Sequence, residues 1–448
     1  MKKITNRILW LFAIGQLGTS MLSGIVINWL VFFYQPNQET INSGQILFIW
    51  QGKFFIGLTI IGLIAAIGRV VDAFTDPLIA SKSDACTHRD GRRIPFMKIS
   101  AIPLGIITVL IFISPVNYVS SINSFFLLVT CLLYYIFMTL YCAPYSALIP
   151  DLGKTQKDRI NVTTFTSVTF FVGTAISYLV PNIANIFKSQ YGYTNSIRIT
   201  IAIMSVIAVI FLFVPVFTIK EKDYVEIKPS KTPAFESLMK TFKNKEFQTF
   251  VISDTIYWIS LTIFQTGMPF YITSLMKLEA SMSFILFAIM TTLSLLFYAP
   301  VNFISRKVGK KKLVVFAFLL FSVDLFITSF SGMLGINGMT NGIIVAVLSS
   351  IPMAILGIIP PAIVADIAQS DSIETEENRE GMFYAARTFC FKLGQSVAII
   401  IFTALAKMGI NGQGYRVSAI IAAILCLVGG IIFVKYNEKK IFLSIKEN

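Results

Sequence analysis

Apolar stretches of about 20 residues recur from one end of this 448-residue chain to the other. A stretch of that length crosses the hydrocarbon core of a bilayer as an α-helix, because a helix satisfies its own backbone hydrogen bonds there. Hydrophobic residues make up 55% of the chain and charged residues only 13%, more apolar surface than a soluble protein of this size could bury. The chain is therefore predicted to be an all-α, multi-pass membrane protein.

The apolar stretches predict twelve membrane spans in two groups of six. The first group is 8–34, 54–80, 96–114, 125–148, 162–187 and 199–219, and the second is 247–274, 284–304, 313–333, 342–367, 383–408 and 417–436. The longest polar segment separates the groups. We predict an N-terminal six-helix bundle (1–220), a cytoplasmic linker (221–246), a C-terminal six-helix bundle (247–436) and a cytoplasmic tail (437–448).

The formal net charge of +14 comes mainly from Lys and Arg residues that lie between spans, so nucleic-acid binding is not expected. The loops 35–45, 115–121, 335–341 and 409–414 carry almost no basic residue, whereas the linker and the loops that alternate with these four are basic. The basic loops contain Lys82, Arg89, Arg92 and Arg93; Lys154, Lys157 and Arg159; and Arg306, Lys307, Lys310, Lys311 and Lys312. The positive-inside rule then predicts that both termini are cytoplasmic.

Similar basic turns occur at the same place in the two halves. Residues 83–93, after the second span, and residues 305–312, after the eighth, are both short, basic and built around a glycine. Together with six spans on either side of a linker, they predict a parallel internal repeat.

The second span carries charged side chains at a depth where each needs a physical explanation. Asp72, Thr75 and Asp76 share one helix face, and Arg69 lies one turn earlier on the same side. Two carboxylates this close cannot both ionise cheaply unless a cation sits between them or one takes a proton. A site for Na⁺, Li⁺ or H⁺ is therefore predicted, and an Arg69–Asp salt bridge that locks the end of the bundle remains the alternative.

Further charged residues in predicted spans of the second half include Asp324, Asp366, Arg387 and Lys392. A lone ammonium such as that of Lys392 needs a buried carboxylate or a wet cavity, and the second-span carboxylates across the interface are candidate partners. Arg387 is a further candidate charge partner. Asp324 is predicted to make a structural polar contact.

Polar residues recur at helical spacing in the first and seventh spans, which are equivalent positions in a duplicated bundle. They are Gln16, Ser20, Gly24 and Asn28 in the first, and Asp254, Trp258, Thr262 and Gln265 in the seventh. Gln16, Asn28 and Gln265 are predicted to line an aqueous cavity. Helix packing through small and hydroxylated residues is the alternative for the Ser, Thr and Gly positions, and Trp258 could either stack on a sugar ring or pack.

The stretch Asp72-Ala-Phe-Thr-Asp-Pro, with Gly91-Arg-Arg-Ile-Pro-Phe in the following loop, resembles the glycoside–pentoside–hexuronide:cation symporters of the major facilitator superfamily. Weaker matches at 143–150, 243–247, 365–367, 379–381 and 392–394 follow in family order. The resemblance implies the two-bundle fold of twelve helices, alternating access and a place in the cell (inner) membrane. It also implies a cation site at the positions of Asp72, Asp76, Thr75 and Thr139, with Lys392 nearby.

The resemblance is incomplete where the substrate would bind. Members such as the melibiose permeases hold sugar hydroxyls with two carboxylates and an arginine, and Ser20, Cys142 and, approximately, Ser167 stand at those places here. Ser146, in the fourth-span motif, is a further candidate for the cavity. The substitutions argue against a galactoside and leave open a neutral sugar or a more amphipathic solute.

The leading prediction is a monomeric secondary active symporter that takes up a sugar or sugar-like solute with Na⁺ or H⁺ and needs no cofactor beyond that ion. The alternatives are an amphiphile, lipid or drug transporter of the same fold and, from another class, a channel or non-transporting membrane scaffold. An enzyme is not expected, because the only histidine, His88, lies in a loop and no nucleophile–base arrangement is evident.

Overall fold

A computed structural model describes residues 5–53, 57–152, 156–221, 239–375, 380–409 and 412–446, and these ranges are helical with no strand among them. The chain divides into two compact units, 1–231 and 232–448, which are considered separately. Most of the predicted linker (222–238), the predicted start of the second span (54–56), Lys154 and Arg379 lie outside the described residues. The side chains of Asp84, Lys157 and Arg159 do so as well.

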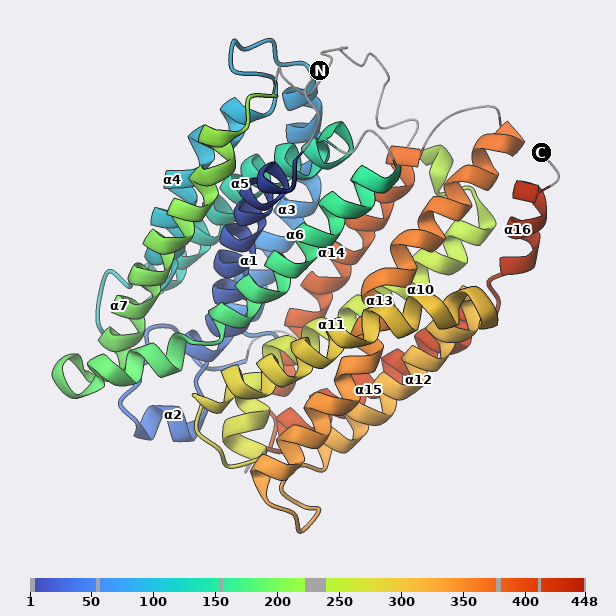
Figure 1. Ribbon diagram of the computed structural model, residues 1–448. Coiled ribbons are helices and arrows are strands. Elements are labelled where there is room, and N and C mark those ends of the chain that lie inside the picture. Colours follow the sequence, from blue (N-terminus) through green and yellow to red (C-terminus); the bar gives the residue numbers. More distant parts are fainter. Residues whose placement is uncertain are drawn as a thin grey trace. The chain divides into compact units, whose positions relative to one another are not determined.

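Unit 1 contains six long helices and one short one (Figure 1). They are α1 (Asn6–Tyr34), α2 (Gln38–Asn42), α3 (Ile60–Asp84), α4 (Ile94–Ile111), α5 (Ser121–Leu152), α6 (Gln156–Ser177) and α7 (Val180–Thr218). Gly192 interrupts α7 with φ +74°, a conformation that glycine adopts without steric cost. The predicted fifth span therefore covers α6 and the start of α7, and the predicted sixth span is the part of α7 that follows Gly192.

Unit 2 has the same number of long helices (Figure 1). They are α10 (Lys245–Phe270), the π-helical turn η2 (Tyr271–Leu275), α11 (Met282–Val308), α12 (Lys310–Ser329), α13 (Gly338–Thr375), α14 (Glu380–Leu405), α15 (Gln413–Phe433) and α16 (Glu438–Lys446). Each predicted span of this half has a helix at its place. The predicted tail forms the short helix α16, which packs on α13.

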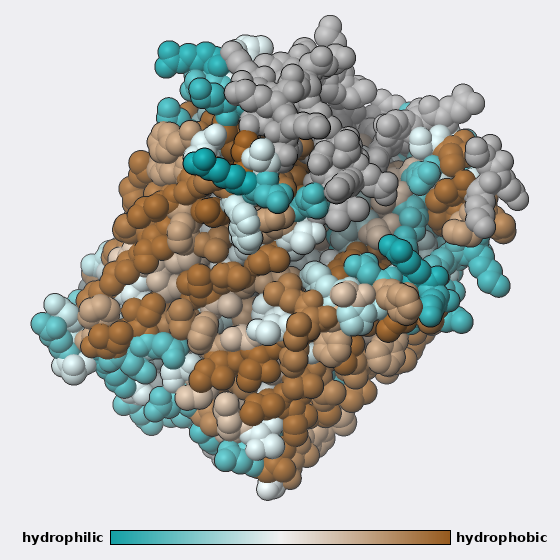
Figure 2. All heavy atoms as spheres, viewed as in Figure 1, coloured by the Kyte–Doolittle hydropathy of each residue, from teal (hydrophilic) through white to brown (hydrophobic). Residues whose placement is uncertain are grey.

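Nine helical segments of the described chain are long and apolar enough to cross a membrane. Helices α3 and α10 are not among them, because they carry the charged and polar side chains that the sequence places in the second and seventh spans. Many large apolar side chains are exposed on the outer faces of the helices, as lipid contact requires. In Figure 2 hydrophobic residues cover the flanks of the helices and hydrophilic residues gather at their ends. The predicted all-α, multi-pass architecture is confirmed.

The helices of the two units pair in the same pattern. In unit 1, α1 packs on α6 and α7, α5 on α3 and α4, and α4 on α7. In unit 2, α10 packs on α14 and α15, α13 on α11 and α12, and α12 on α15. When the helices are numbered by predicted span within each half, each of these five pairings in one unit has its counterpart in the other. This confirms the internal repeat.

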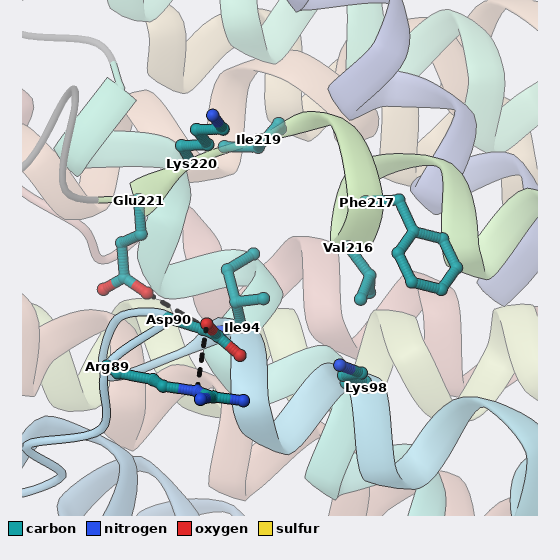
Figure 3. A pocket seen from close by; sticks show the side chains of 9 residues that line it. All are labelled: Arg89, Asp90, Ile94, Lys98, Val216, Phe217, Ile219, Lys220 and Glu221. Atoms are coloured by element: carbon teal, nitrogen blue, oxygen red, sulfur yellow. Dashed lines mark hydrogen bonds and ion pairs between the residues drawn. The ribbon is translucent and has the colours of Figure 1, made fainter.

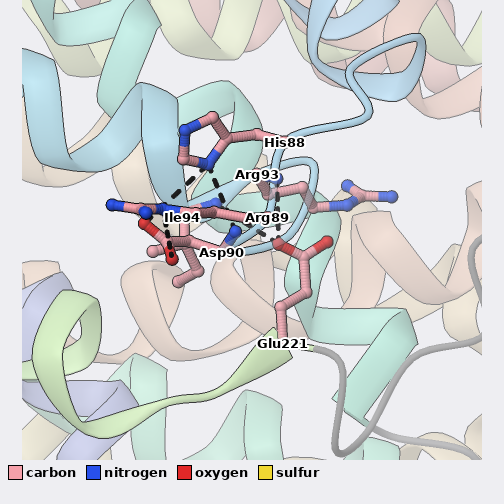
Figure 4. A network of polar contacts seen from close by, with 6 residues as sticks. All are labelled: His88, Arg89, Asp90, Arg93, Ile94 and Glu221. Carbon is pink, nitrogen blue, oxygen red and sulfur yellow. Dashed lines mark hydrogen bonds and ion pairs between the residues drawn. The ribbon is translucent and has the colours of Figure 1, made fainter.

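The basic turn of unit 1 is closed by a glutamate that lies far away in the sequence (Figure 4). The Glu221 carboxylate accepts hydrogen bonds from the backbone N–H groups of Arg93 (2.9 Å) and Ile94 (3.3 Å), where α4 begins. Gly91 has φ +118°, and a Cβ there would lie 2.2 Å from Glu221 Oε2. A carboxylate at this place satisfies donors that a helix start leaves free and complements the helix dipole.

The basic turn of unit 2 is closed in the same way. The Glu438 carboxylate accepts hydrogen bonds from the backbone N–H groups of Lys310 (2.7 Å) and Lys311 (3.1 Å), where α12 begins. Gly309 has φ +92°, and a Cβ there would lie 3.0 Å from Glu438 Oε2. The repeat thus includes a capping glutamate a few residues after the last long helix of each unit, Glu221 in unit 1 and Glu438 in unit 2.

Candidate functional site

Asp72 lies on α3 with its side chain turned into unit 1, and only 4% of its surface is exposed. Thr59 precedes α3 and caps it, because its hydroxyl accepts a hydrogen bond from the N–H of Gly62, and the helix packs along α5. This packing brings Thr139 of α5 against α3, and the Thr139 hydroxyl donates to Asp72 Oδ1 at 2.8 Å. A buried carboxylate with a hydroxyl partner is therefore present at the predicted position.

Thr75 adds a third oxygen to this pair. Its hydroxyl lies 3.3 Å from that of Thr139 and donates to the backbone carbonyl of Asp72 at 3.2 Å. One carboxylate and two hydroxyl oxygens from two packed helices thus lie together. Oxygen ligands of this kind suit a hard cation, and the carboxylate also suits a proton. Asp76, one turn further along α3, is half-buried.

Arg69 approaches the other oxygen of the same carboxylate. Its Nη1 lies 3.6 Å from Asp72 Oδ2, a single contact longer than a hydrogen bond. The guanidinium lies over the ring of Tyr135 on α5, 5.2 Å from its centroid, and Gly68 leaves room for that ring. The arginine therefore also contacts an aromatic face, and the two oxygens of Asp72 have different partners: Thr139 at Oδ1 and Arg69 at Oδ2.

Unit 2 contains a charge pair of a different kind. Arg387 on α14 donates through Nε and Nη2 to the two carboxylate oxygens of Asp254 on α10, at 2.8 and 3.0 Å. Both side chains are nearly buried, with 4% of Asp254 and 11% of Arg387 exposed. Phe391 stacks on Trp258 one turn further along, with ring centroids 4.6 Å apart. The predicted charge partner Arg387 thus has a carboxylate within its own unit.

Lys392 is half-buried on α14, five residues after Arg387. Its predicted contact with the second-span carboxylates would join the two units and stays a prediction. Two other charged residues of the second half make contacts within unit 2. Asp324 is fully buried and accepts a hydrogen bond from Ser349, and Asp366 pairs with Lys310 at 2.5 Å.

Two predicted cavity residues of the first span lie in the seam where α1 packs on α6. The Ser20 hydroxyl donates to the carbonyl of Gln16 at 2.7 Å, and a Cβ on Gly173 of α6 would lie 2.1 Å from it. Asn28 donates to Ser177 at 3.1 Å and accepts from Tyr178 at 3.2 Å. These contacts are helix-packing contacts, and substrate binding by these residues stays a prediction.

The other predicted cavity residues vary in exposure. Ser146 is exposed and Thr262 is buried, and the other five are half-buried: Gln16, Cys142, Ser167, Trp258 and Gln265. Trp258 Nε1 and the Thr262 hydroxyl are buried without a hydrogen-bond partner among the described residues. Buried donors without partners are uncommon, so these two atoms of α10 are unsatisfied polar groups next to the Arg387–Asp254 pair in sequence.

Sequence reasoning missed three features of these sites. Tyr135 carries no charge, so nothing in the sequence pairs it with Arg69. Asp254 was assigned to the polar stripe of the seventh span, but its ion pair with Arg387, 133 residues away, was not predicted. Glu221 and Glu438 are ordinary members of polar segments. Only their equal positions, each just after the last span of its half, could have indicated a common role.

Two six-helix units with the same pairing of helices and with buried charges are typical of transporters of the major facilitator type. The chain belongs to the MFS/sugar transport protein family, whose model matches residues 11–437. The predicted family resemblance, fold class and transporter class are confirmed, and the protein is a sugar transporter rather than an enzyme. A family of this type implies a small-molecule solute.

Similar curated proteins are bacterial. The putative glycoside/cation symporter YagG of Escherichia coli K12 is 29% identical over 205 residues, which are 42% of this chain and 43% of that protein. The isoprimeverose transporter of Lactiplantibacillus pentosus is 23% identical over 364 residues, covering 79% of this chain and 74% of the other. The uncharacterized symporter YjmB of Bacillus subtilis 168 is 25% identical over 379 residues, covering 80% and 76%.

Solved structures of major facilitator transporters share the fold. The xylose transporter XylE from E. coli, in its inward-open conformation, has a TM-score of 0.69 at 14% identity, covering 98% of this chain and 99% of that one. A bacterial homologue of the peptide transporters PepT1 and PepT2 has a TM-score of 0.69 at 11% identity, covering 96% and 98%.

Proposed function

We propose that this protein is a symporter that uses a Na⁺ or H⁺ gradient to take up a sugar or sugar-like solute across the inner membrane, with its termini in the cytoplasm. The two units would alternate access around the bound solute. The names of the glycoside/cation symporter and the isoprimeverose transporter support a glycoside more than an amphiphile. The substrate class is thus proposed from the names of the relatives, and the coupling of transport to an ion is proposed from the structure.

One observation carries the coupling proposal: the buried Asp72 carboxylate accepts a hydrogen bond from Thr139 at Oδ1, the Thr75 hydroxyl lies 3.3 Å from that of Thr139, and Arg69 lies 3.6 Å from the other oxygen. A cation bound at this oxygen would neutralise the carboxylate inside the bundle, and protonation would do the same. Once an ion or a proton has neutralised the carboxylate, burying it costs less free energy. The protein therefore shifts towards the conformation in which this carboxylate is most buried. Binding of the ion and movement of the two units are coupled in this way.

The hydroxyl groups of Thr139 and Thr75 offer a way to tell Na⁺ coupling from H⁺ coupling. Hydroxyl oxygens add ligands for Na⁺, whereas a proton on Asp72 needs only an acceptor within hydrogen-bond distance. Loss of the Thr139 hydroxyl would therefore weaken coupling to Na⁺ and leave coupling to H⁺ largely intact.

Uptake of radiolabelled glycosides into proteoliposomes tests the proposal. Wild-type protein is expected to accumulate its substrate under an inward Na⁺ or H⁺ gradient, and Asp72→Asn is expected to equilibrate it without accumulation. The matched control is Asp90→Asn, an exposed carboxylate in the loop before α4. Gradient-driven accumulation by Asp72→Asn at the wild-type level would refute coupling at this site.

A further inference from the structure

An open hollow of about 460 Å³ lies at the surface of unit 1, where α4 begins and α7 ends (Figure 3). Its volume far exceeds the roughly 30 Å³ share of one water molecule in the liquid. Arg89, Lys98 and Lys220 line it. The hollow belongs to the side of the membrane that the sequence assigns to the cytoplasm.

The positive charge of the hollow is only partly balanced. Arg89 Nε lies 3.9 Å from Asp90 Oδ1, an exposed contact that water screens. The Glu221 carboxylate is fully buried. Its Oε2 accepts hydrogen bonds from two backbone N–H groups, and its Oε1 lies 3.8 Å from Arg92 Nε. Neither Lys98 nor Lys220 pairs with a carboxylate in the part of the chain described here. The ammonium groups of the two lysines are therefore free to bind an anion in the hollow.

Apolar stripes lead from the hollow into the membrane. Along α4, the exposed residues next to Lys98 are Ile99, Ile102 and Ile106, which recur at helical spacing. On α7, which packs on α4, Phe217 is 70% exposed beside the hollow, and Ile210 is exposed two turns earlier. Such stripes contact acyl chains, so an anion seated among the lysines would lie at the end of a lipid's hydrocarbon tails.

We propose that this hollow binds the headgroup of an anionic phospholipid from the cytoplasmic leaflet. The phosphate would lie between Lys98 and Lys220 with Arg89 at the rim, and the acyl chains would follow the stripes of α4 and α7. Basic pockets between helices at a membrane surface recognise lipid headgroups by this combination of charge and apolar contact. The lipid would also join the basic turn before α4 to the end of α7, the two segments that Glu221 connects.

Native mass spectrometry of the full-length protein with added phosphatidylglycerol or phosphatidylcholine tests the proposal. Wild-type protein is expected to retain phosphatidylglycerol preferentially. The double variant Lys98→Gln/Lys220→Gln should bind it about 25-fold more weakly, roughly fivefold for each lysine. The variant Lys98→Arg/Lys220→Arg keeps both charges and should retain the lipid, which separates loss of charge from a folding defect.

The matched control is Lys53→Gln/Lys188→Gln, which removes two exposed charges from loops and helix ends elsewhere in unit 1. An equal loss of phosphatidylglycerol in this control would overturn the proposal, because retention would then reflect net charge. Equal retention of phosphatidylcholine would overturn it as well. Release of the lipid by millimolar inorganic phosphate would assign the hollow to a free anion and contradict a phospholipid site.

Discussion

The two units each bury a carboxylate inside the membrane, and they stabilise it differently. Asp254 receives two short hydrogen bonds from Arg387, one on each oxygen. Asp72 has a guanidinium 3.6 Å from one oxygen and a hydroxyl 2.8 Å from the other. A bidentate pair is a strong and geometrically specific contact, whereas hydroxyls can turn to share an ion. The comparison supports a structural role for Asp254 and is the basis on which we propose Asp72 as the ligand of an exchangeable ion.

The largest expected effect is on the stability of unit 2. Asp254→Asn leaves the Arg387 charge buried and unpaired, so the free energy of unfolding should fall by about 3–5 kcal/mol. The double variant Asp254→Asn/Arg387→Gln should recover much of this loss, since neither charge remains. Reversible unfolding in mixed micelles measures both values. A double variant as unstable as the sum of the two single variants would show that the ion pair itself contributes nothing.

A smaller effect on stability and a large one on coupling are expected for Asp72→Asn. The amide of the variant can still accept a neutral hydrogen bond from Thr139, the long charge contact is lost, and Arg69 keeps the face of Tyr135, so the cost should be about 1–2 kcal/mol. Comparison of its unfolding with that of Asp254→Asn measures the difference between the two carboxylates. Equal destabilisation of the two variants would contradict the distinction drawn between them.

Loss of a single hydroxyl should affect ion binding more than folding. Thr139→Val removes one proposed ligand, and the half-saturating Na⁺ concentration for uptake should rise about tenfold, which corresponds to about 1.4 kcal/mol. Thr130→Val is the matched control on the same helix, because the Thr130 hydroxyl bonds only to backbone carbonyls of α5. The same rise in the control variant would mean that Na⁺ affinity reports helix packing rather than a ligand.

The smallest expected difference concerns the two capping glutamates. Glu221→Gln should destabilise unit 1 by about 1–2 kcal/mol, since Glu221 is fully buried and also faces Arg92. Glu438→Gln should cost less, about 0.5–1 kcal/mol, because the half-buried Glu438 keeps more of its contact with water. Thermal unfolding of the two variants under identical conditions measures the order, and a reversed order would contradict it.

The sequence predicted the helices well and their contacts poorly, for a physical reason. The hydrocarbon thickness of the bilayer sets the length of a span, so the number and place of the apolar stretches could be found without any tertiary information. Asp72, Thr75 and Arg69 lie within two turns of one helix, so their grouping followed from helical spacing. The hydrogen bond from Thr139 spans 67 residues, and only the resemblance to a known family had indicated that residue.

Contacts between distant helices account for what was not predicted. The pairing of Asp254 with Arg387 and the capping of α4 by Glu221 depend on how helices pack, which hydropathy does not encode. The break in α7 at Gly192 arises from one residue with a positive φ, which the sequence did not distinguish from the other 26 glycines.

The most direct test is a cation titration of the purified protein by isothermal titration calorimetry, with proton release followed in parallel. Wild-type protein is expected to bind Na⁺ at one saturable site or, if coupled to H⁺, to exchange one proton with the medium when the sugar binds. The Asp72→Asn variant should do neither and should still bind the sugar. A variant that binds the cation as wild-type protein does would show that the ion binds elsewhere.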